Sequence, residues 1–341
     1  MEKTKKIGIL TAGGDCPGLN AAIRGVGKTA IVKYGMEVIG FSDGFLGLIN
    51  KEYIPLQEKM LSGILTVGGT ILGTSREKPF KKSGELDIDK PTLIKKHYDE
   101  LGLDCLVCIG GNGTMKTAGR LQEEGLNIIG IPKTIDNDVW GTDRTFGFDS
   151  ALYICTESID RLHSTANSHK RIMVIELMGH SAGWLTLYSG MAGGGDVILI
   201  PEIEYDINVV NNYLLNRAKR DKPYSIVVVA EGIEKPKGES AAGYIARMIE
   251  EGTGIETRQT ILGYIQRGGS PTPNDRILAT RFGASAVNLI AKEKYGRMVV
   301  KKGEDIESIS LEKVAGKTRL VPKKHPLIKK AKGLDVCLGV A

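Results

Sequence analysis

The chain of 341 residues has few of the features that mark secreted or membrane proteins. Its five cysteines are odd in number and irregularly spaced, which is typical of reduced thiols and not of a disulfide framework. No apolar stretch approaches the ~20 residues that a transmembrane helix needs. The charged segment Met1–Lys6 runs into the apolar segment Ile7–Leu10, which is too short for a secretion signal. These absences predict a cytoplasmic protein with no membrane partner.

Aromatic residues and net charge are also low. Aromatic side chains make up 6% of the chain, and Lys plus Arg exceed Asp plus Glu by 46 − 40 = 6 charges. No basic stripe with interleaved aromatic side chains is present, so we expect no nucleic-acid partner. A small positive excess equally suits anionic small molecules as ligands.

Glycine, in contrast, is abundant. The chain has 44 glycines among 341 residues, or about 13%, against a usual share of about 7%. Many of them cluster between apolar runs, at Gly13-Gly14, Gly68-Gly69, Gly110-Gly111, Gly193–Gly195 and Gly268-Gly269. Glycine allows positive φ angles and lets a ligand approach the backbone closely. The clusters therefore predict several loops around one large anionic ligand, or around two ligands.

Short apolar runs alternate with helix-like segments along the chain. The runs are Lys6–Leu10, Cys105–Ile109, Asn127–Ile131, Ile172–Leu177, Ser225–Ala230 and Gln259–Ile265. This alternation predicts an α/β fold with parallel sheets. In such folds ligands bind at the loops that follow the carboxyl ends of the strands.

Two glycine-rich loops have the context of phosphate sites. Gly13–Asn20 follows a predicted strand and opens a predicted helix, and Gly110–Thr114 does the same. Backbone N–H groups in such a turn, together with a helix N-terminus, bind phosphate. A tight strand-to-helix turn is the alternative for either loop alone, but two loops together favour a nucleotide ligand.

The segment Pro132–Asp138 carries two carboxylates, Asp136 and Asp138. In an extended segment both would face the same side, together with Thr134. Phosphoryl transfer needs such a pair, because one carboxylate can accept the proton of the attacking hydroxyl while the other binds Mg²⁺. A loop with solvated carboxylates is the alternative. Guanidinium groups suited to phosphate stand in or beside glycine- or threonine-rich turns, at Arg76, Arg171, Arg258 and Arg267.

These motifs, in this order, resemble those of the phosphofructokinases of the bacterial type. The matching stretches are Gly13–Asn20, Gly69–Arg76, Ile109–Thr114, Pro132–Asp138, Met178–Trp184, Pro201-Glu202, Leu262–Pro271 and Asp275-Arg276. The resemblance implies two doubly wound, Rossmann-like parallel-sheet domains that face each other across an active-site cleft. It places a larger phosphoryl-donor domain at 1–147 plus about 267–315, and a smaller sugar-phosphate domain at 148–266 plus about 316–341.

The activity that the resemblance implies is the glycolytic phosphorylation of fructose 6-phosphate at its 1-hydroxyl. Asp136 matches the general base, Thr134 and Lys133 stand beside the transferring phosphate, and Asp138 and Asn112 match residues near Mg²⁺. The residues that match the donor site are Gly14, Arg76, Gly111, Asn112, Gly113 and Thr114. The residues that match the sugar-phosphate site are Thr134, Asp136, Arg171, Met178, Gly179, His180, Glu231, Arg258, Tyr264 and Arg267.

The resemblance also implies an assembly. Arg171 and Arg258 match residues that reach the 6-phosphate from a neighbouring subunit. We therefore expect a homo-oligomer, a homotetramer in particular, whose active sites are shared between subunits.

The donor signature is mixed. Gly113 leaves room for a nucleotide and matches users of ATP, whereas Lys133 matches users of pyrophosphate. A lysine can swing aside on its flexible stem, so we give Gly113 more weight and expect ATP, with pyrophosphate as the alternative. A catalytically inactive regulatory paralogue is a further alternative, and the presence of both Asp136 and Asp138 argues against it.

Three positions depart from the usual pattern of the family. Asn112 stands where an aspartate is usual, His180 where an arginine is usual, and Tyr264 where the ATP type commonly has histidine. An amide oxygen is a neutral ligand, so Mg²⁺ would depend more on Asp138 and on the donor phosphates. At pH 7 the histidine lacks the fixed positive charge of an arginine.

Overall fold

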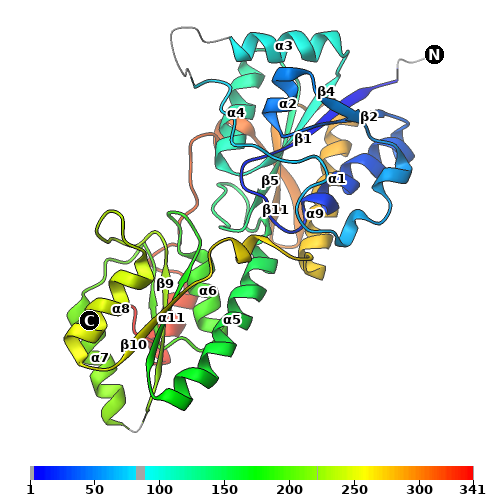
Figure 1. Ribbon diagram of the computed structural model, residues 1–341. Coiled ribbons are helices and arrows are strands. Elements are labelled where there is room, and N and C mark those ends of the chain that lie inside the picture. The colour runs from blue at the N-terminus through cyan, green and yellow to red at the C-terminus, as the bar shows by residue number, and fades with distance from the viewer. Residues whose placement is uncertain (1–3, 82–88, 221, 341) are drawn as a thin grey trace. The chain divides into compact units, whose positions relative to one another are not determined.

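The computed structural model describes residues 4–81, 89–220 and 222–340, which form two compact units (Figure 1). The first unit comprises the described residues up to Thr134, Asp138–Asp149 and Arg267–Thr318. The second comprises Ile135–Asn137, Ser150–Gln266 and the described residues from Arg319 onward. Each unit has its own sheet, and the predicted α/β class with parallel-rich sheets is confirmed.

The sheet of the first unit has the strand order β12-β11-β5-β4-β1-β2-β3, with β6 paired to β5. Its five central strands are parallel, and β3 and β12 are antiparallel strands at its two edges. The strands are β1 (Lys6–Ala12), β2 (Glu37–Phe41), β3 (Tyr53–Pro55), β4 (Cys105–Gly110), β5 (Ile128–Thr134), β6 (Phe146–Gly147), β11 (Arg297–Lys302) and β12 (Asp305–Ser310). Strand β4 is buried along its whole length, because a central parallel strand is covered on both faces.

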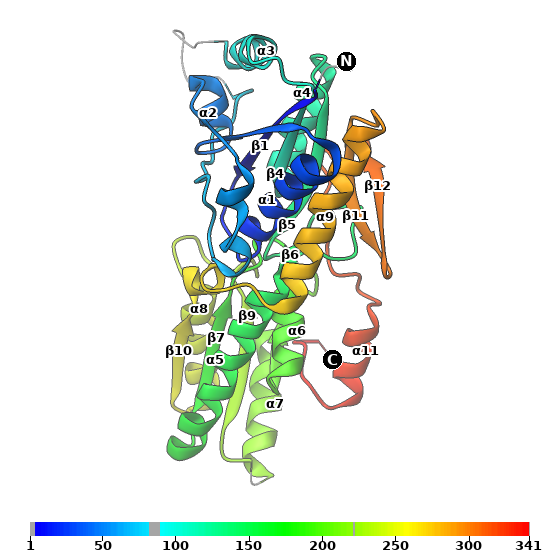
Figure 2. The ribbon, with the colours of Figure 1, turned by 90° about the vertical axis from the view of Figure 1, so that its right-hand side faces the viewer.

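Helices cover both faces of this sheet. The helices are α1 (Leu19–Lys28), α2 (Phe45–Asn50), α3 (Lys90–Glu100), α4 (Asn112–Glu123), α9 (Pro273–Ala291) and α10 (Leu311–Val314). Helices α1 and α9 lie side by side (Figures 1 and 2). Their close approach depends on glycine, because a Cβ at Gly25 would lie 2.8 Å from the Thr280 carbonyl oxygen. Side chains of α2, α3 and α4 fill a core on the other face.

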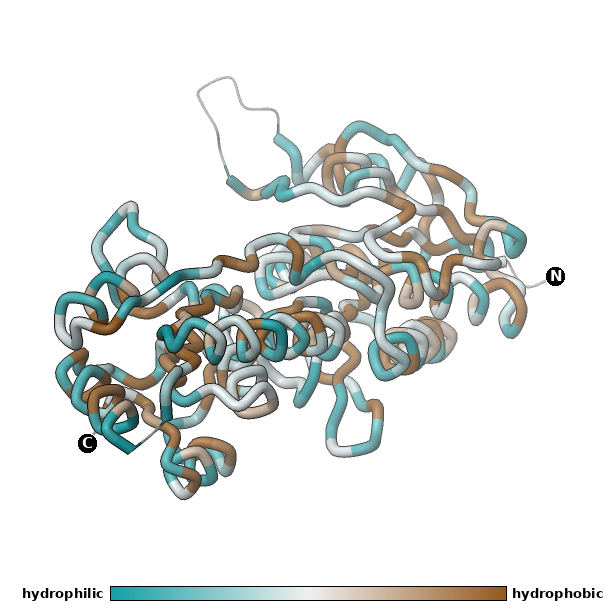
Figure 3. The backbone as a smooth tube through the Cα atoms, turned by 60° about the horizontal axis from the view of Figure 1, so that its bottom comes forward, coloured by the Kyte–Doolittle hydropathy of each residue, from teal (hydrophilic) through white to brown (hydrophobic). Residues whose placement is uncertain are grey.

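The sheet of the second unit has the order β10-β7-β9-β8, and all its strands are parallel. The strands are β7 (Ile172–Leu177), β8 (Val197–Leu199), β9 (Ser225–Ala230) and β10 (Thr257–Ile261). The helices are α5 (Phe148–His169), which begins in the first unit, α6 (Trp184–Ala192), α7 (Ile207–Lys219), α8 (Ala241–Thr253) and α11 (Pro326–Gly333). Apolar and polar residues alternate along much of the backbone (Figure 3), and in α7 and α8 the buried residues recur at helical spacing, as expected of helices that cover a sheet with one face.

Some predicted element boundaries are wrong. The apolar run Gln259–Ile265 does not form one strand, because β10 ends at Ile261 and a short 3-10 helix follows at Gly263–Arg267. Asn137 has a φ of 53°, and β5 has already ended at Thr134. The segment that carries Asp136 and Asp138 is therefore not extended, so the alternation of an extended strand does not determine where the two carboxylates point. Among the described residues, no helix combines the length and the apolar character needed to span a membrane.

Candidate active site

Three loops of the first unit meet where parallel strands end. Ala12 at the end of β1 is the partner of Gly110 on β4, and Gly110 is the partner of Pro132 on β5. The loops that follow these strands therefore start side by side, although they are far apart in sequence. This register assembles the predicted donor residues of the first unit at one edge of its sheet.

The loop after β1 is held by the segment that leads to Arg76. The Gly13 N–H donates to the Ser75 carbonyl at 2.9 Å, and the Thr74 hydroxyl donates to the Gly13 carbonyl at 2.7 Å. Gly13 has a φ of 88°, which favours glycine at this turn. These contacts place Arg76 beside the glycine loop, as a donor-site residue requires.

Gly14 lies against two cationic side chains of the first unit. A Cβ on Gly14 would come within 2.8 Å of Nη1 of Arg267. The Lys133 ammonium donates a hydrogen bond to the Gly14 carbonyl, and Lys133 is only 3% exposed. The backbone at Gly14 is thus in close contact with two positively charged side chains, and only a glycine leaves room for Arg267 there.

Helix α4 begins beside this loop without a side-chain cap. Gly111 is its N-cap residue, and the first turn holds no acidic residue. Uncapped N–H groups and the helix dipole attract an anion at such an end. Thr114 is buried and its hydroxyl donates to the Ala12 carbonyl at 3.3 Å, whereas a Cβ at Gly113 would meet no atom within 4 Å. The first turn of α4 is therefore hydrogen-bonded to the end of β1, and the space beside Gly113 is free of other described atoms.

The side chains of Asn112 and Asp138 form a pair in the first unit. Nδ2 of Asn112 donates to Oδ2 of Asp138 at 2.8 Å and to its backbone carbonyl at 3.2 Å. Oδ1 of Asn112 is buried and has no hydrogen-bond partner among the described residues. A buried amide oxygen next to a carboxylate fits a hard cation such as Mg²⁺, which prefers oxygen ligands.

Larger metal clusters are not found in the described part of the chain, where no three His, Cys, Asp or Glu side chains converge. In proteins Mg²⁺ commonly binds to one or two carboxylates, with phosphates and water as its other ligands. Asn112 and Asp138 are thus the residues that fit the predicted metal site.

In the second unit the loop after β7 is organised by Glu231. Its carboxylate Oε1 accepts the N–H of Gly179 at 3.2 Å and that of His180 at 2.7 Å. His180 has a φ of 53° and Gly179 one of 151°, so the loop adopts a shape that side chains with a Cβ disfavour. Met178, Gly179, His180 and Glu231 are therefore together at the carboxyl ends of β7 and β9.

In the second unit, Arg171 and Arg258 lie at the amino-terminal ends of the strands, opposite the carboxyl ends that Met178 and Glu231 follow. Arg171 precedes β7, and Arg258 is the second residue of β10, where it is the partner of Met173. Met178 follows the other end of β7. At ~3.3 Å per residue, the seven steps from Arg171 to Met178 span roughly 20 Å. One copy of this unit therefore does not bring the two arginines to Met178 and Glu231.

Three further predicted residues lie at or next to boundaries between segments of the two units. Tyr264 lies in the 3-10 helix and is 73% exposed. Thr134 ends β5 in the first unit, and its carbonyl accepts the Thr145 hydroxyl at 2.8 Å. Asp136 follows in the short segment Ile135–Asn137 that groups with the second unit, and its side chain is half-buried.

The roles of two residues, Gln266 and Glu256, were not predicted from the sequence. The Gln266 amide is fully buried, accepts the Met178 N–H at 3.0 Å and donates to the Gly263 carbonyl at 3.0 Å. Its place in the motif Leu262–Pro271 was the available signal. Glu256 pairs with Arg171 at 2.6 Å and with Arg258. A carboxylate two residues before Arg258 was the only hint in the sequence.

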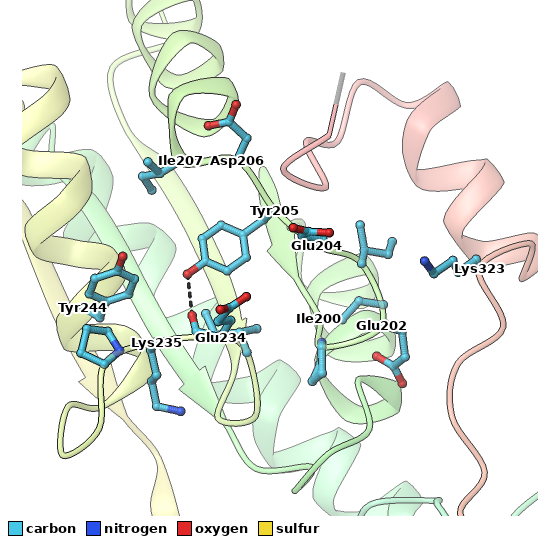
Figure 4. Close-up of a pocket in the computed structure, with 14 residues that line it drawn as sticks. Ile200, Glu202, Glu204, Tyr205, Asp206, Ile207, Glu234, Lys235, Tyr244 and Lys323 are labelled. Atoms are coloured by element: carbon cyan, nitrogen blue, oxygen red, sulfur yellow. Dashed lines mark hydrogen bonds between the residues drawn. The ribbon is translucent and has the colours of Figure 1, made fainter.

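A cavity of about 900 Å³ lies elsewhere in the second unit (Figure 4). It is lined by the segments after β8 and β9, and the Tyr205 hydroxyl donates to the Glu234 carbonyl there at 2.7 Å. Burial raises the pKa of Tyr205 to about 12. None of the predicted site residues lines this cavity.

Comparisons with known proteins identify relatives of this chain. The family model described as phosphofructokinase matches residues 6–290. A relative from Bacteroides thetaiotaomicron, named ATP-dependent 6-phosphofructokinase 3, is 63% identical over 98% of this chain and 100% of its own length. One from Spirochaeta thermophila, named ATP-dependent 6-phosphofructokinase, is 54% identical over 98% of each chain.

Solved structures share the fold. Phosphofructokinase from Saccharomyces cerevisiae matches with a TM-score of 0.80 and 30% identity, over 91% of this chain and 45% of the yeast chain. A pyrophosphate-dependent phosphofructokinase from Marinobacter aquaeolei matches with a TM-score of 0.83 and 23% identity, over 93% of this chain and 86% of its own. The predicted family is confirmed: this chain belongs to the phosphofructokinase family.

Proposed function

We propose that this protein is an ATP-dependent 6-phosphofructokinase, which transfers the γ-phosphoryl group of ATP to the 1-hydroxyl of fructose 6-phosphate in glycolysis. The observation that carries the proposal is the 63% identity, over essentially the full length of both chains, to a relative named for this activity. The open space at Gly113 supports ATP as donor, because the nucleoside needs room beside the phosphates.

The predicted donor residues belong to the first unit. The glycine loop after β1, the N-terminus of α4 and Arg76 bind the donor phosphates. Asn112 and Asp138 are the residues that would hold Mg²⁺, and bound Mg²⁺ supplies positive charge against the phosphate oxygens. Lys133, next to Gly14, adds a fixed positive charge at the same loop.

Most of the predicted sugar-phosphate residues belong to the second unit. Asp136 accepts the proton of the sugar 1-hydroxyl as that oxygen attacks the phosphorus. Glu231 and the loop Met178–His180 bind the sugar, and Arg171 and Arg258 reach the 6-phosphate from a neighbouring copy. The separation of roughly 20 Å along β7 supports this sharing, because it prevents one copy from supplying both groups.

A pyrophosphate-dependent enzyme is the second candidate. The observation that favours it is the Lys133 ammonium at the Gly14 carbonyl, since an extra charge in the donor loop suits a compact, highly charged donor. The two candidates predict different donors for the same acceptor reaction.

A donor comparison tests both. Purified protein is assayed with fixed fructose 6-phosphate and Mg²⁺, and kcat/KM is measured for ATP and for pyrophosphate. We expect a strong preference for ATP. A preference for pyrophosphate would establish the second candidate, and no phosphorylation of fructose 6-phosphate with either donor would contradict the proposed function as a whole.

A further inference from the structure

We propose that Glu256 is a positioning residue of the sugar-phosphate site, which holds Arg171 and Arg258 in the orientation that binds the 6-phosphate of a neighbouring copy's substrate. This inference rests on the proposed function, and it assigns a role to a residue outside every motif described above. The carboxylate itself does not touch the sugar phosphate.

Both arginines use the same carboxylate. Nε of Arg171 donates to Oε2 of Glu256 at 2.6 Å, and Nη2 of Arg258 donates to Oε1. The backbone keeps these groups in register, because the Ile172 N–H donates to the Glu256 carbonyl at 3.1 Å. Glu256 therefore connects the amino ends of two neighbouring parallel strands, β7 and β10.

The geometry at Arg171 leaves its outer edge available. Glu256 engages Nε, and no described residue accepts a hydrogen bond from Nη1 or Nη2 of Arg171. A guanidinium presents its N–H groups as a rigid planar fork, so fixing Nε also fixes the direction of the two terminal nitrogens. Those two nitrogens are the pair that can bind a phosphate in a bidentate manner.

Charge explains why a carboxylate is needed here. Two guanidinium groups held near each other repel, and Glu256 compensates one of the two charges. The cluster keeps a net charge of +1, which still attracts a phosphate monoester of about −2 at neutral pH. The arginine side chains are 30% and 52% exposed, so a ligand can reach them.

The first test compares Glu256→Ala and Glu256→Gln with the wild type. We expect the KM for fructose 6-phosphate to rise about tenfold in Glu256→Ala, as for a lost charge-assisted hydrogen bond, with smaller changes in kcat and in the KM for ATP. The stabilisation of the protein by fructose 6-phosphate in a thermal shift should weaken, while that by ATP should persist.

The matched control is Glu239→Gln, which removes another exposed Arg–Glu pair of the second unit, 3.1 Å from Arg247. It should leave all these values unchanged. A double-mutant cycle adds a readout that a merely structural role would not move. Because Glu256 acts partly through Arg171 and partly through Arg258, the double variant Arg171→Ala with Glu256→Ala should raise the KM for fructose 6-phosphate by less than the two single effects combined.

Four outcomes would overturn the inference. These are an unchanged KM for fructose 6-phosphate, a lower KM (which would make Glu256 a competitor of the phosphate), additive effects in the cycle, or loss of activity through dissociation of the oligomer in sedimentation. Failure of the proposed function is distinguishable, because the wild type itself would then not phosphorylate fructose 6-phosphate.

Discussion

Asn112 shows how a single amide changes the chemistry of the donor site. Its nitrogen donates to the Asp138 carboxylate at 2.8 Å, whereas the aspartate usual in the family would place a second carboxylate there. The amide thus lets one carboxylate remain buried without a like charge beside it, and it leaves Oδ1 of Asn112 as a neutral oxygen ligand. In the proposed metal site, the residue at position 112 would therefore affect both the stability of the metal-free protein and the affinity for Mg²⁺.

The variant Asn112→Asp tests this balance. Without Mg²⁺ it should be less stable by about 1–3 kcal/mol, because a hydrogen bond to a charged group is lost and two carboxylates repel. With Mg²⁺ the loss should shrink, and the Mg²⁺ affinity should rise. Thermal unfolding in EDTA and across a Mg²⁺ titration measures both effects. Equal destabilisation with and without Mg²⁺ would contradict the assignment of this pair to the metal.

Asp136 is the residue on which the proposed chemistry depends most. Asp136→Asn should lower kcat by about 10²–10⁴-fold, the usual contribution of a general base, and change the KM for fructose 6-phosphate little. Steady-state kinetics measure both values. The exposed Asp99 on α3 offers a control, since Asp99→Asn should behave as the wild type. A kcat near that of the wild type in Asp136→Asn would exclude this residue as the base.

Among the elements, helix α11 carries its own titratable cap. Nδ1 of His325 accepts the Leu327 N–H at 3.2 Å, and its ring packs edge-on against Trp184 at 5.3 Å. Burial, aided by the nearby Arg319 charge, lowers the pKa of His325. The folded protein therefore favours the neutral imidazole, which is also the form that can accept at the cap.

Because the pKa of His325 is lowered in the folded protein, we expect the stability of the protein to decrease as the pH falls. An unfolded histidine takes up a proton near pH 6.5, whereas the folded chain resists protonation of His325, so stability is lost as the pH falls through this range. His325→Asn keeps an acceptor at the cap and should give a flatter Tm profile between pH 7.5 and 5. The exposed His169 at the end of α5 is the control, and His169→Asn should keep the wild-type slope.

At the scale of the whole molecule, the positions of Arg171 and Arg258 bear on the proposed binding of the sugar 6-phosphate. Arg171 and Arg258 lie at the amino edge of the second sheet, while Met178 and Glu231 follow the carboxyl ends of its strands. No motion within β7 brings these two ends together. The sugar-phosphate site is therefore proposed to be complete only in an oligomer.

Subunit mixing tests this assembly. Asp136→Asn and Arg171→Ala are each expected to have little activity at low fructose 6-phosphate, but a hybrid has one site with the wild-type Asp136 of one copy and the wild-type Arg171 of the other. Random pairing of equal amounts should restore about a quarter of wild-type activity, as counted for a two-fold pair with two shared sites.

A second mixture serves as its control. Asp136→Asn with Glu231→Gln should restore nothing, because both residues belong to the same copy's site. Activity is measured after co-refolding, with hybrids confirmed by mass. Confirmed hybrids of the first mixture that remain inactive would contradict the shared site.

The alternation of strands and helices, and the loops that follow β1, β4 and β5, could be predicted from the sequence by itself. Buried parallel strands are near-continuous apolar runs, and a turn with the positive φ of Gly13 favours glycine, so both leave local signals in the sequence. Asp136, Asp138 and Asn112 could likewise be selected as candidate site residues from the sequence, because a motif preserves residue types and their spacing.

Only the tertiary structure decided how these residues are oriented and which of them meet. Asn137 adopts a left-handed conformation shortly after the end of β5, and no local sequence pattern predicted this conformation. Glu256 between two arginines, Gln266 at the Met178 N–H and the nitrogen of Asn112 facing Asp138 all join segments distant in the chain. Such contacts depend on strand order and register, which are set by packing over the whole sheet and not by the neighbours of any one residue.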